Sequence, residues 1–313
     1  MSGAKKFLAF DIGGTKIAHA LTDSRGCLLE EPQRDATPRD NDEIFRLLQE
    51  IVRRYEAEID GVAIATAGEA DLDNRRIISS VGNMPKGYMD TVFEKLTSKP
   101  VYVENDANAA LWGEYCCGAA KGCRNVMLVA IGTGVGVAFL VDGKLLKGKS
   151  GAAGEAHFPV NRGQVRRCTC GAWDCYEIYA SGTALGLDAK EVFGDPSVTS
   201  YDVIKGIKAG DARAVKAYEI WEHDVMQGIA GLANIFDPEM VVMFGSLTEF
   251  MNFGKLQDEV NRQILSAPLV LRRAELENNA AMVGAQGYFE YVSGTRGDMT
   301  LNARATLDID SVQ

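Results

Sequence analysis

The most specific chemical signal in the sequence is a group of three closely spaced cysteines. Cys168, Cys170 and Cys175 fall within eight residues, and His157 lies shortly before them. Three thiolates and one imidazole are a ligand set of closed structural zinc sites. Unliganded thiols and a disulfide between neighbours are the alternatives, and the histidine within range favours zinc. Because four protein ligands leave no position for a reactive water, we expect this zinc to fix a loop rather than to catalyse a reaction.

Two glutamates flank the cysteine cluster. Glu155 lies in G-E-A-H at residues 154–157, and Glu177 follows the last cysteine by two positions. A loop fixed by metal could hold both carboxylates where they accept hydrogen bonds from a polyol. Either glutamate alone would more often be a solvated surface group.

Two glycine-rich turns could bind phosphate. D-I-G-G-T-K spans residues 11–16 and G-T-G-V-G spans residues 132–136. Each offers unhindered backbone N–H groups and a threonine hydroxyl, which suit phosphate oxygens. Asp11 could hold Mg²⁺, most simply through water. Either turn alone is typical of an ordinary hairpin, but two at matched places predict a paired phosphate clamp.

The motif E-N-D-A-N at residues 104–108 follows an apolar strand and precedes a helix. Asparagine and aspartate are favoured at a helix N-terminus, so a capping role alone is one interpretation. The other is a general base that takes a proton from an attacking hydroxyl. In that interpretation Asp106 is the base and Asn105 is a substrate ligand.

The residues around these motifs alternate between strand and helix patterns. Apolar strands flank the first glycine turn within residues 6–23. Periodicity predicts helices at 41–57, 88–96 and 108–120, and strands at 61–67 and 100–106. This alternation is typical of an α/β layer with partly parallel strands.

The strand–turn–strand pattern recurs at an offset of 119 residues, which places Gly132 on Gly13. We interpret the recurrence as an internal duplication and expect two similar lobes facing each other across a cleft. A helix at 212–236, a strand at 239–246 and a final helix at 279–292 follow. The predicted divisions are an N-terminal lobe at 1–120, a C-terminal lobe with the zinc loop at 121–294, and a tail at 295–313. The last helix could return to the first lobe.

Composition and charge exclude several classes of protein. Hydrophobic residues are 46% of the chain and charged residues 24%, which is ordinary for a globular protein. A net charge of −10 disfavours a nucleic-acid surface. Glycines interrupt the longest uncharged run, at residues 125–141, so we expect no membrane span. Without an apolar leader, and with seven cysteines that cannot all pair, the protein is expected in the cytoplasm.

With these motifs in order, the sequence from Phe7 to Phe289 resembles the ROK family (repressors, open reading frames, sugar kinases) of the actin-like ATPase superfamily. The resemblance rests on D-I-G-G-T-K, V-E-N-D-A-N-A-A, I-G-T-G-V-G, and C-x-C-G-x-x-x-C-x-E followed by A-S-G. The cysteine motif is the most specific of these. The resemblance implies an α/β fold of two RNase H-like lobes around a central cleft that binds ATP and Mg²⁺. It also implies transfer of the γ-phosphate to a hexose hydroxyl, usually the 6-OH.

The resemblance assigns roles residue by residue. It implies that Asp106 is the catalytic base. The sugar ligands that it implies are Gly68, Asn83, Asn105, Asp106, Glu155, His157 and Glu177. The residues that it places against ATP are Asp11, Gly13, Gly14, Thr15, Lys16, Gly132, Thr133, Gly134, Gly245 and Ser246. His157, Cys168, Cys170 and Cys175 are the zinc ligands.

Two departures from the family pattern stand out. The family usually has G-E-x-G-H, whereas this chain has G-E-A-H, one residue shorter. The spacing from Glu155 to Cys168 is kept, which puts in question the role of His157 as a metal ligand and as a sugar contact. The adenosine segment F-G-S-L at 244–247 also holds less glycine than is usual.

Three functions fit these observations: an ATP-dependent sugar kinase, a ROK-type sugar-responsive repressor, and a non-catalytic sugar sensor. Ten residues precede Asp11, too few for a helix-turn-helix module, and a sensor would not need Asp106. The sequence therefore predicts the kinase. Glucose is the first candidate substrate, and N-acetylmannosamine, N-acetylglucosamine, fructose and β-glucosides stay open. Relatives in the family lead us to expect a homodimer or homotetramer.

Overall fold

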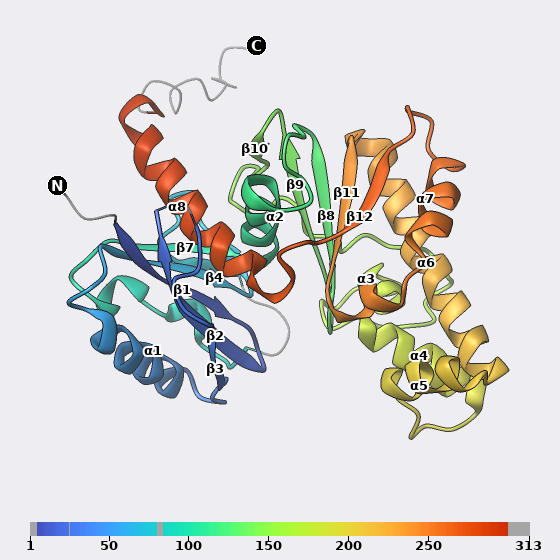
Figure 1. The fold of residues 1–313 in the computed structure, drawn as a ribbon. Coiled ribbons are helices and arrows are strands. Elements are labelled where there is room, and N and C mark those ends of the chain that lie inside the picture. The colour runs from blue at the N-terminus through green and yellow to red at the C-terminus, as the bar shows by residue number, and fades with distance from the viewer. Residues whose placement is uncertain (1–4, 25, 80–83, 300–313) are drawn as a thin grey trace, which may run out of the picture.

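Two five-stranded sheets of the same strand order form the framework of the molecule (Figure 1). The computed structural model describes residues 5–24, 26–79 and 84–299, with side chains up to residue 294. In spatial order, the first sheet holds β3 (Gln33–Ala36), β2 (Lys16–Asp23), β1 (Lys6–Ile12), β4 (Gly61–Thr66) and β7 (Val101–Asn105). The second holds β10 (Lys144–Leu145), β9 (Val135–Val141), β8 (Val126–Ile131), β11 (Met240–Phe244) and β12 (Val270–Arg273).

The pairing pattern repeats between the sheets. In the first sheet, β1 pairs antiparallel with β2 and parallel with β4. In the second, β8 pairs antiparallel with β9 and parallel with β11. The two glycine turns therefore occupy equivalent hairpins, which confirms the expected repeat of one α/β unit. The boundary near residue 120 stays a prediction.

Each sheet packs its own helices over one face. In the first unit this is the amphipathic helix α1 (Asn41–Tyr55), whose Ile44, Leu48 and Ile51 are fully buried against the strands. Asp40 caps it by accepting hydrogen bonds from the backbone N–H groups of its first turn. The helices of the second unit are α3 (Glu177–Ala180), α4 (Gly182–Phe193), α5 (Ser200–Ala209), α6 (Ala212–Phe236) and α7 (Phe253–Asn261).

Two helices cross between the sheets. Helix α2 (Asp106–Cys117) follows a strand of the first sheet but packs on β8 and β9, while α8 (Ala280–Met299) follows the second sheet and packs on β1 and β4. They meet between the two sheets (Figure 1). A β-carbon on Gly284 would lie 1.6 Å from the carbonyl oxygen of Ala109, so only glycine permits this crossing. The shared core joins the two units into one packed body.

Two predictions about elements were wrong. Residues 88–96 do not form one helix: 3₁₀ turns η1 (Tyr88–Asp90) and η2 (Phe93–Leu96) are separated at Thr91, whose backbone is extended. The β-branched Thr91 and Val92 disfavour a continuous helix there. Helix α8 continues to Met299, into the expected tail, since no proline interrupts the backbone between residues 293 and 299.

Short elements complete the fold. They are β5 (Glu69–Ala70), β6 (Ile77–Ser79), η3 (Ser246–Phe250) and η4 (Glu277–Asn279). Among the described residues, no helix combines the length and the apolar character needed to cross a membrane.

Candidate active site

The carboxyl ends of three neighbouring strands bring the first group of predicted residues together. In the parallel register, Ile12 of β1 lies beside Thr66 of β4, and Thr66 lies beside Asn105 of β7. Asp11 and Asp106 therefore flank the same edge of the sheet. The charge of Asp11 acts on the pKa of Asp106, which confirms their proximity.

Asn105 and Asp106 show the capping role that was one of the two interpretations of their motif. Asn105 is the N-cap of α2: its side-chain oxygen accepts a hydrogen bond from the N–H of Asn108 at 3.0 Å. Its amide nitrogen donates to the carbonyl oxygen of Gly68 at 3.0 Å. Asp106 is the first helical residue, and its carboxylate accepts the N–H of Ala107 at 2.8 Å. The cap thus holds the carboxylate at the sheet edge.

The pKa values of both aspartates are raised. Burial raises the pKa of Asp106 to about 7, and the negative charges of Asp11 and Glu155 add to the effect. Burial also raises the pKa of Asp11 to about 6, against the lowering effect of Lys16 and Arg34. A carboxylate with a pKa near neutral pH is well matched to accept a proton from a hydroxyl. Glu155 belongs to the second unit, so its charge also shows that this unit lies close to Asp106.

The first glycine turn is closed by short backbone contacts. The N–H of Gly13 donates to the carbonyl oxygen of Lys16 at 3.0 Å, and the hydroxyl of Thr37 donates to the carbonyl oxygen of Gly13 at 2.5 Å. The N–H of Thr37 donates to the carbonyl oxygen of Thr15. These hydrogen bonds occupy the carbonyl oxygens of Gly13, Thr15 and Lys16. They fix the shape of the turn, which a phosphate-binding loop would require.

The second glycine turn contacts Glu177, which begins α3 just after the cysteine cluster. The carboxylate of Glu177 accepts the N–H of Val135 at 3.1 Å, and a β-carbon on Gly134 would lie 2.3 Å from the same carboxylate. The N–H of Gly182 donates to the carbonyl oxygen of Gly132, and the hydroxyl of Thr183 donates to that of Thr133. The predicted sugar ligand Glu177 therefore also supports the second glycine turn.

The four predicted zinc ligands converge. The nitrogen or sulfur atoms of His157, Cys168, Cys170 and Cys175 all lie within 4.8 Å of one another. Tetrahedral zinc, with Zn–S bonds of about 2.3 Å, separates its ligands by about 3.8 Å. The donor set and its spacing fit zinc, and the shorter G-E-A-H motif still brings His157 to the group. Zinc itself stays a prediction.

The two ring nitrogens of His157 face different groups. Nδ1 lies 3.3 Å from the sulfur of Cys175, and Nε2 lies 3.3 Å from the carboxylate of Glu155. A carboxylate on the outer nitrogen is the usual way to orient a metal-bound histidine. The same contact uses the nitrogen that would otherwise face a sugar. The side chain of Glu155 is 39% exposed.

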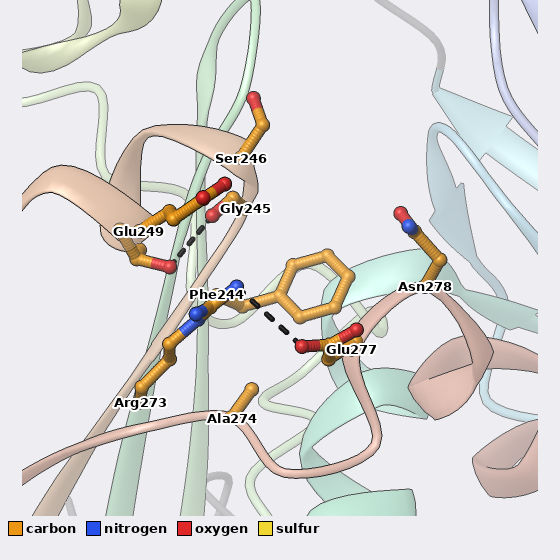
Figure 2. A pocket seen from close by; sticks show the side chains of 9 residues that line it. Phe244, Gly245, Ser246, Glu249, Arg273, Ala274, Glu277 and Asn278 are labelled. Atoms are coloured by element: carbon orange, nitrogen blue, oxygen red, sulfur yellow. Dashed lines mark hydrogen bonds and ion pairs between the residues drawn. The ribbon is translucent and has the colours of Figure 1, made fainter.

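A pocket of about 380 Å³ lies beside the second sheet (Figure 2). Its lining includes the predicted Gly245 and Ser246. Gly245 has a φ of +113°, and a β-carbon there would lie 2.1 Å from the carbonyl oxygen of Ile131, so the position requires glycine. Lys16 reaches the same pocket from the first unit, because its Nζ donates to Asn278 at 3.5 Å.

Sequence reasoning missed the rest of this lining. The other lining residues are Phe244, Thr248, Glu249, Arg273, Ala274, Glu277 and Asn278. Figure 2 shows the ring of Phe244 facing the space between Glu277 and the η3 segment, with Arg273 paired to Glu277 at 3.5 Å. These residues come from two parts of the sequence, 244–249 and 273–278, and form no recognisable motif. Only the folded structure shows that they line one pocket. The predicted Asn83 lies outside the described residues.

Comparison with known proteins now decides the family. A model described as the ROK family matches residues 7–290. The chain belongs to the ROK family. The glycine turns, the E-N-D-A-N motif and the cysteine cluster all lie within the matched region.

Relatives of this ROK protein include glucokinase from Streptomyces coelicolor, 30% identical over 311 residues that cover 89% of this chain and 95% of the relative. N-acetylmannosamine kinase from Yersinia pseudotuberculosis is 31% identical over 77% of this chain and 83% of its own. The crystal structure of a ROK family glucokinase from Streptomyces griseus, in complex with glucose and AMPPNP, superimposes with a TM-score of 0.77. That protein is 29% identical, and the match covers 91% of this chain and 99% of the other. The fold is accordingly that of the actin-like ATPases, with two RNase H-like units.

Proposed function

We propose that this ROK protein transfers the γ-phosphate of ATP to a hydroxyl group of a hexose, the 6-OH in the first instance, with glucose as the leading substrate. The observation that carries the proposal is Asp106. Its carboxylate lies at the end of β7 beside the first glycine turn, is fixed by the N-terminus of α2, and has a pKa of about 7.

The general activity rests on the relatives. Proteins named glucokinase and N-acetylmannosamine kinase match this chain over most of their length. The protein is an ATP-dependent sugar kinase. Which sugar it uses is the finer question, because the two relatives act on different ones and nothing in the described site separates them.

Phosphoryl transfer needs a positioned hydroxyl, an oriented donor and compensation of negative charge. Asp106 would accept the proton of the sugar hydroxyl as that oxygen attacks the γ-phosphorus. The two glycine turns would offer backbone N–H groups to the phosphates. Asp11 would hold Mg²⁺, which would neutralise charge on the phosphates when bound. The pocket at Gly245 would take the adenosine.

The sugar would lie between Asp106 and Glu155. Asn105, Gly68, Asn83 and Glu177 complete the proposed contact set, and the predicted ligand His157, whose ring nitrogens face Cys175 and Glu155, would act on the sugar through Glu155. Zinc at the Cys₃His group would hold the loop that carries Glu155, through the contact between Glu155 and His157. This role needs no open coordination position.

A coupled assay of ADP release tests the proposal. The panel is glucose, N-acetylmannosamine, N-acetylglucosamine, fructose and a β-glucoside, each with Mg-ATP. We expect one sugar to give clearly the highest kcat/KM, and ³¹P NMR of the product to show a phosphate ester at its primary hydroxyl. Sugar binding by calorimetry without any ADP release across the panel would contradict a kinase and would favour a sensor or a regulator.

A further inference from the structure

A buried ion pair joins the two units next to the sugar site. Glu104 is the last but one residue of β7 in the first unit and is fully buried. Lys147 follows β10 in the second unit, and its side chain is 12% exposed. The ammonium group of Lys147 donates to both carboxylate oxygens of Glu104, at 2.6 and 2.7 Å. Neither residue was selected by the sequence analysis.

Glu104 also accepts hydrogen bonds from the residues of the first unit that border the proposed sugar site. Its Oε1 accepts the backbone N–H of Asn105 at 3.0 Å and the side-chain amide of Asn108 at 3.1 Å. Its Oε2 accepts the side-chain amide of Asn74 at 2.7 Å and the hydroxyl of Tyr102 at 3.2 Å. One carboxylate thus holds the residue before Asp106, the first turn of α2, and the loop between β5 and β6.

Lys147 shapes the turn of the second unit that leads to Glu155, on the other side of the proposed sugar site. Its carbonyl oxygen accepts the N–H groups of Gly151 at 3.1 Å and Ala153 at 3.3 Å, which forms the turn that leads to Glu155. A β-carbon on Gly151 would lie 2.0 Å from the carbonyl oxygen of Ala70, so this turn is seated against β5 of the first unit. The Lys147 side chain therefore anchors the Glu155 loop to β7, the strand that ends just before Asp106.

We infer that Lys147 and Glu104 are positioning residues that set the distance between Asp106 and Glu155, and hence the affinity for the sugar. The inference rests on the proposed function, since it assigns the sugar to this gap. A carboxylate that is buried without its cation is costly, whereas a neutral pair in the same place is tolerated. Stability and sugar affinity can therefore be separated by experiment.

The test compares Lys147→Met, the double variant Glu104→Gln/Lys147→Met, and the control Lys144→Met, whose side chain is exposed on β10. Each is purified, its thermal midpoint is measured, and binding of D-glucose is measured by calorimetry well below that midpoint. N-acetylmannosamine replaces glucose if the unaltered protein phosphorylates only that sugar. Activity of the unaltered protein tests the proposed function independently of the variants.

We expect Lys147→Met to lower the thermal midpoint. Sugar binding should weaken by about tenfold to a hundredfold, because Glu155 would no longer lie at the right distance from Asp106. The double variant should regain part of the midpoint, because the glutamine removes the uncompensated charge, although its amide nitrogen faces donors that the carboxylate accepted. It should keep the weak sugar binding, because the link between the units is still missing. The KM for Mg-ATP should change by less than about threefold in both, a change of well under 1 kcal/mol. Lys144→Met should match the unaltered protein.

A merely structural ion pair predicts a different outcome. Sugar affinity would then recover together with stability in the double variant, and this result would overturn the inference. Unaltered sugar binding in Lys147→Met would do the same. If the single variant does not fold, the double variant decides the question alone.

Discussion

Replacing Asp106 by Asn should make the protein less active and more stable. The asparagine keeps the shape and the oxygen that accepts the N–H of Ala107, but it cannot take a proton. Removing a general base typically costs about 10²- to 10⁴-fold in kcat. Sugar binding should be largely kept, because the capping contacts of Asn105 are untouched.

The stability gain follows from the raised pKa. The pKa of Asp106 rises from its ordinary 3.8 to about 7 in the folded protein, chiefly because the carboxylate is buried. The folded state therefore holds the proton more tightly than the unfolded chain, so ionisation opposes folding. This cost is absent below pH 4, grows between pH 4 and 7, and is complete above pH 7. At about 1.4 kcal/mol for each pKa unit, this free-energy cost is at most about 4 kcal/mol.

Denaturant unfolding at pH 8 and pH 5 measures this effect. We expect Asp106→Asn to raise the unfolding free energy by about 2–4 kcal/mol at pH 8. The value lies below the full cost of ionisation because the Asp106 side chain is partly accessible to water. At pH 5 most of the gain should be gone. The exposed Asp258→Asn is the control. In the unaltered enzyme, kcat/KM should fall about tenfold for each pH unit below 7 as the base is protonated. A variant with near-normal turnover, or one that gains no stability at pH 8, would refute the assignment.

Three further perturbations test the rest of the site. Chelation of the metal at His157 and Cys175 should release one Zn²⁺ per chain and lower both the thermal midpoint and activity, because the binding free energy of a structural metal is folding free energy; purified protein without bound metal would oppose this. Gly134→Val should weaken Mg-ATP binding more than sugar binding, because a branched side chain in the second glycine turn would block the approach of phosphate oxygens to its backbone N–H groups; the reverse order, measured by calorimetry, would assign that turn to the sugar. Glu114→Ala should lower the unfolding free energy by about 3 kcal/mol, since the buried carboxylate accepts backbone N–H groups from three residues, two of them just before α8; a change below about 0.5 kcal/mol by denaturant unfolding would contradict this account.

Sequence reasoning located most of the elements that carry the site. Helix α6 lies at 212–236 as predicted, and the repeated hairpins align at the expected offset. These segments are long, or strongly apolar on one face, so their local pattern agrees with the packed structure. The short strand β12 and the helices α4 and α5 were not predicted; in the structure the two helices pack against α6, and β12 pairs with β11.

The cysteine cluster was also readable, because metal ligands must come from a small set of residue types at short spacing. The pocket proposed for adenosine was not readable, apart from Gly245 and Ser246. Its charged lining, Glu249, Arg273 and Glu277, comes from three separate segments. Charged residues in those segments look like ordinary surface groups until the fold places them around one space.

For Glu104, burial could be predicted from the sequence, but the identity of its partner could not. It lies in V-Y-V-E-N, within a strand whose other central residues are apolar, so its burial could have been expected from the pattern. A buried carboxylate requires hydrogen-bond donors or a cation, and the pattern therefore implied a partner somewhere in the chain. The identity of that partner was hidden, because Lys147 lies 43 residues later in a loop rich in lysine and glycine. Only the packing of one unit against the other selects Lys147 over Lys144 or Lys149, and the same packing brings together the residues of the proposed sugar site.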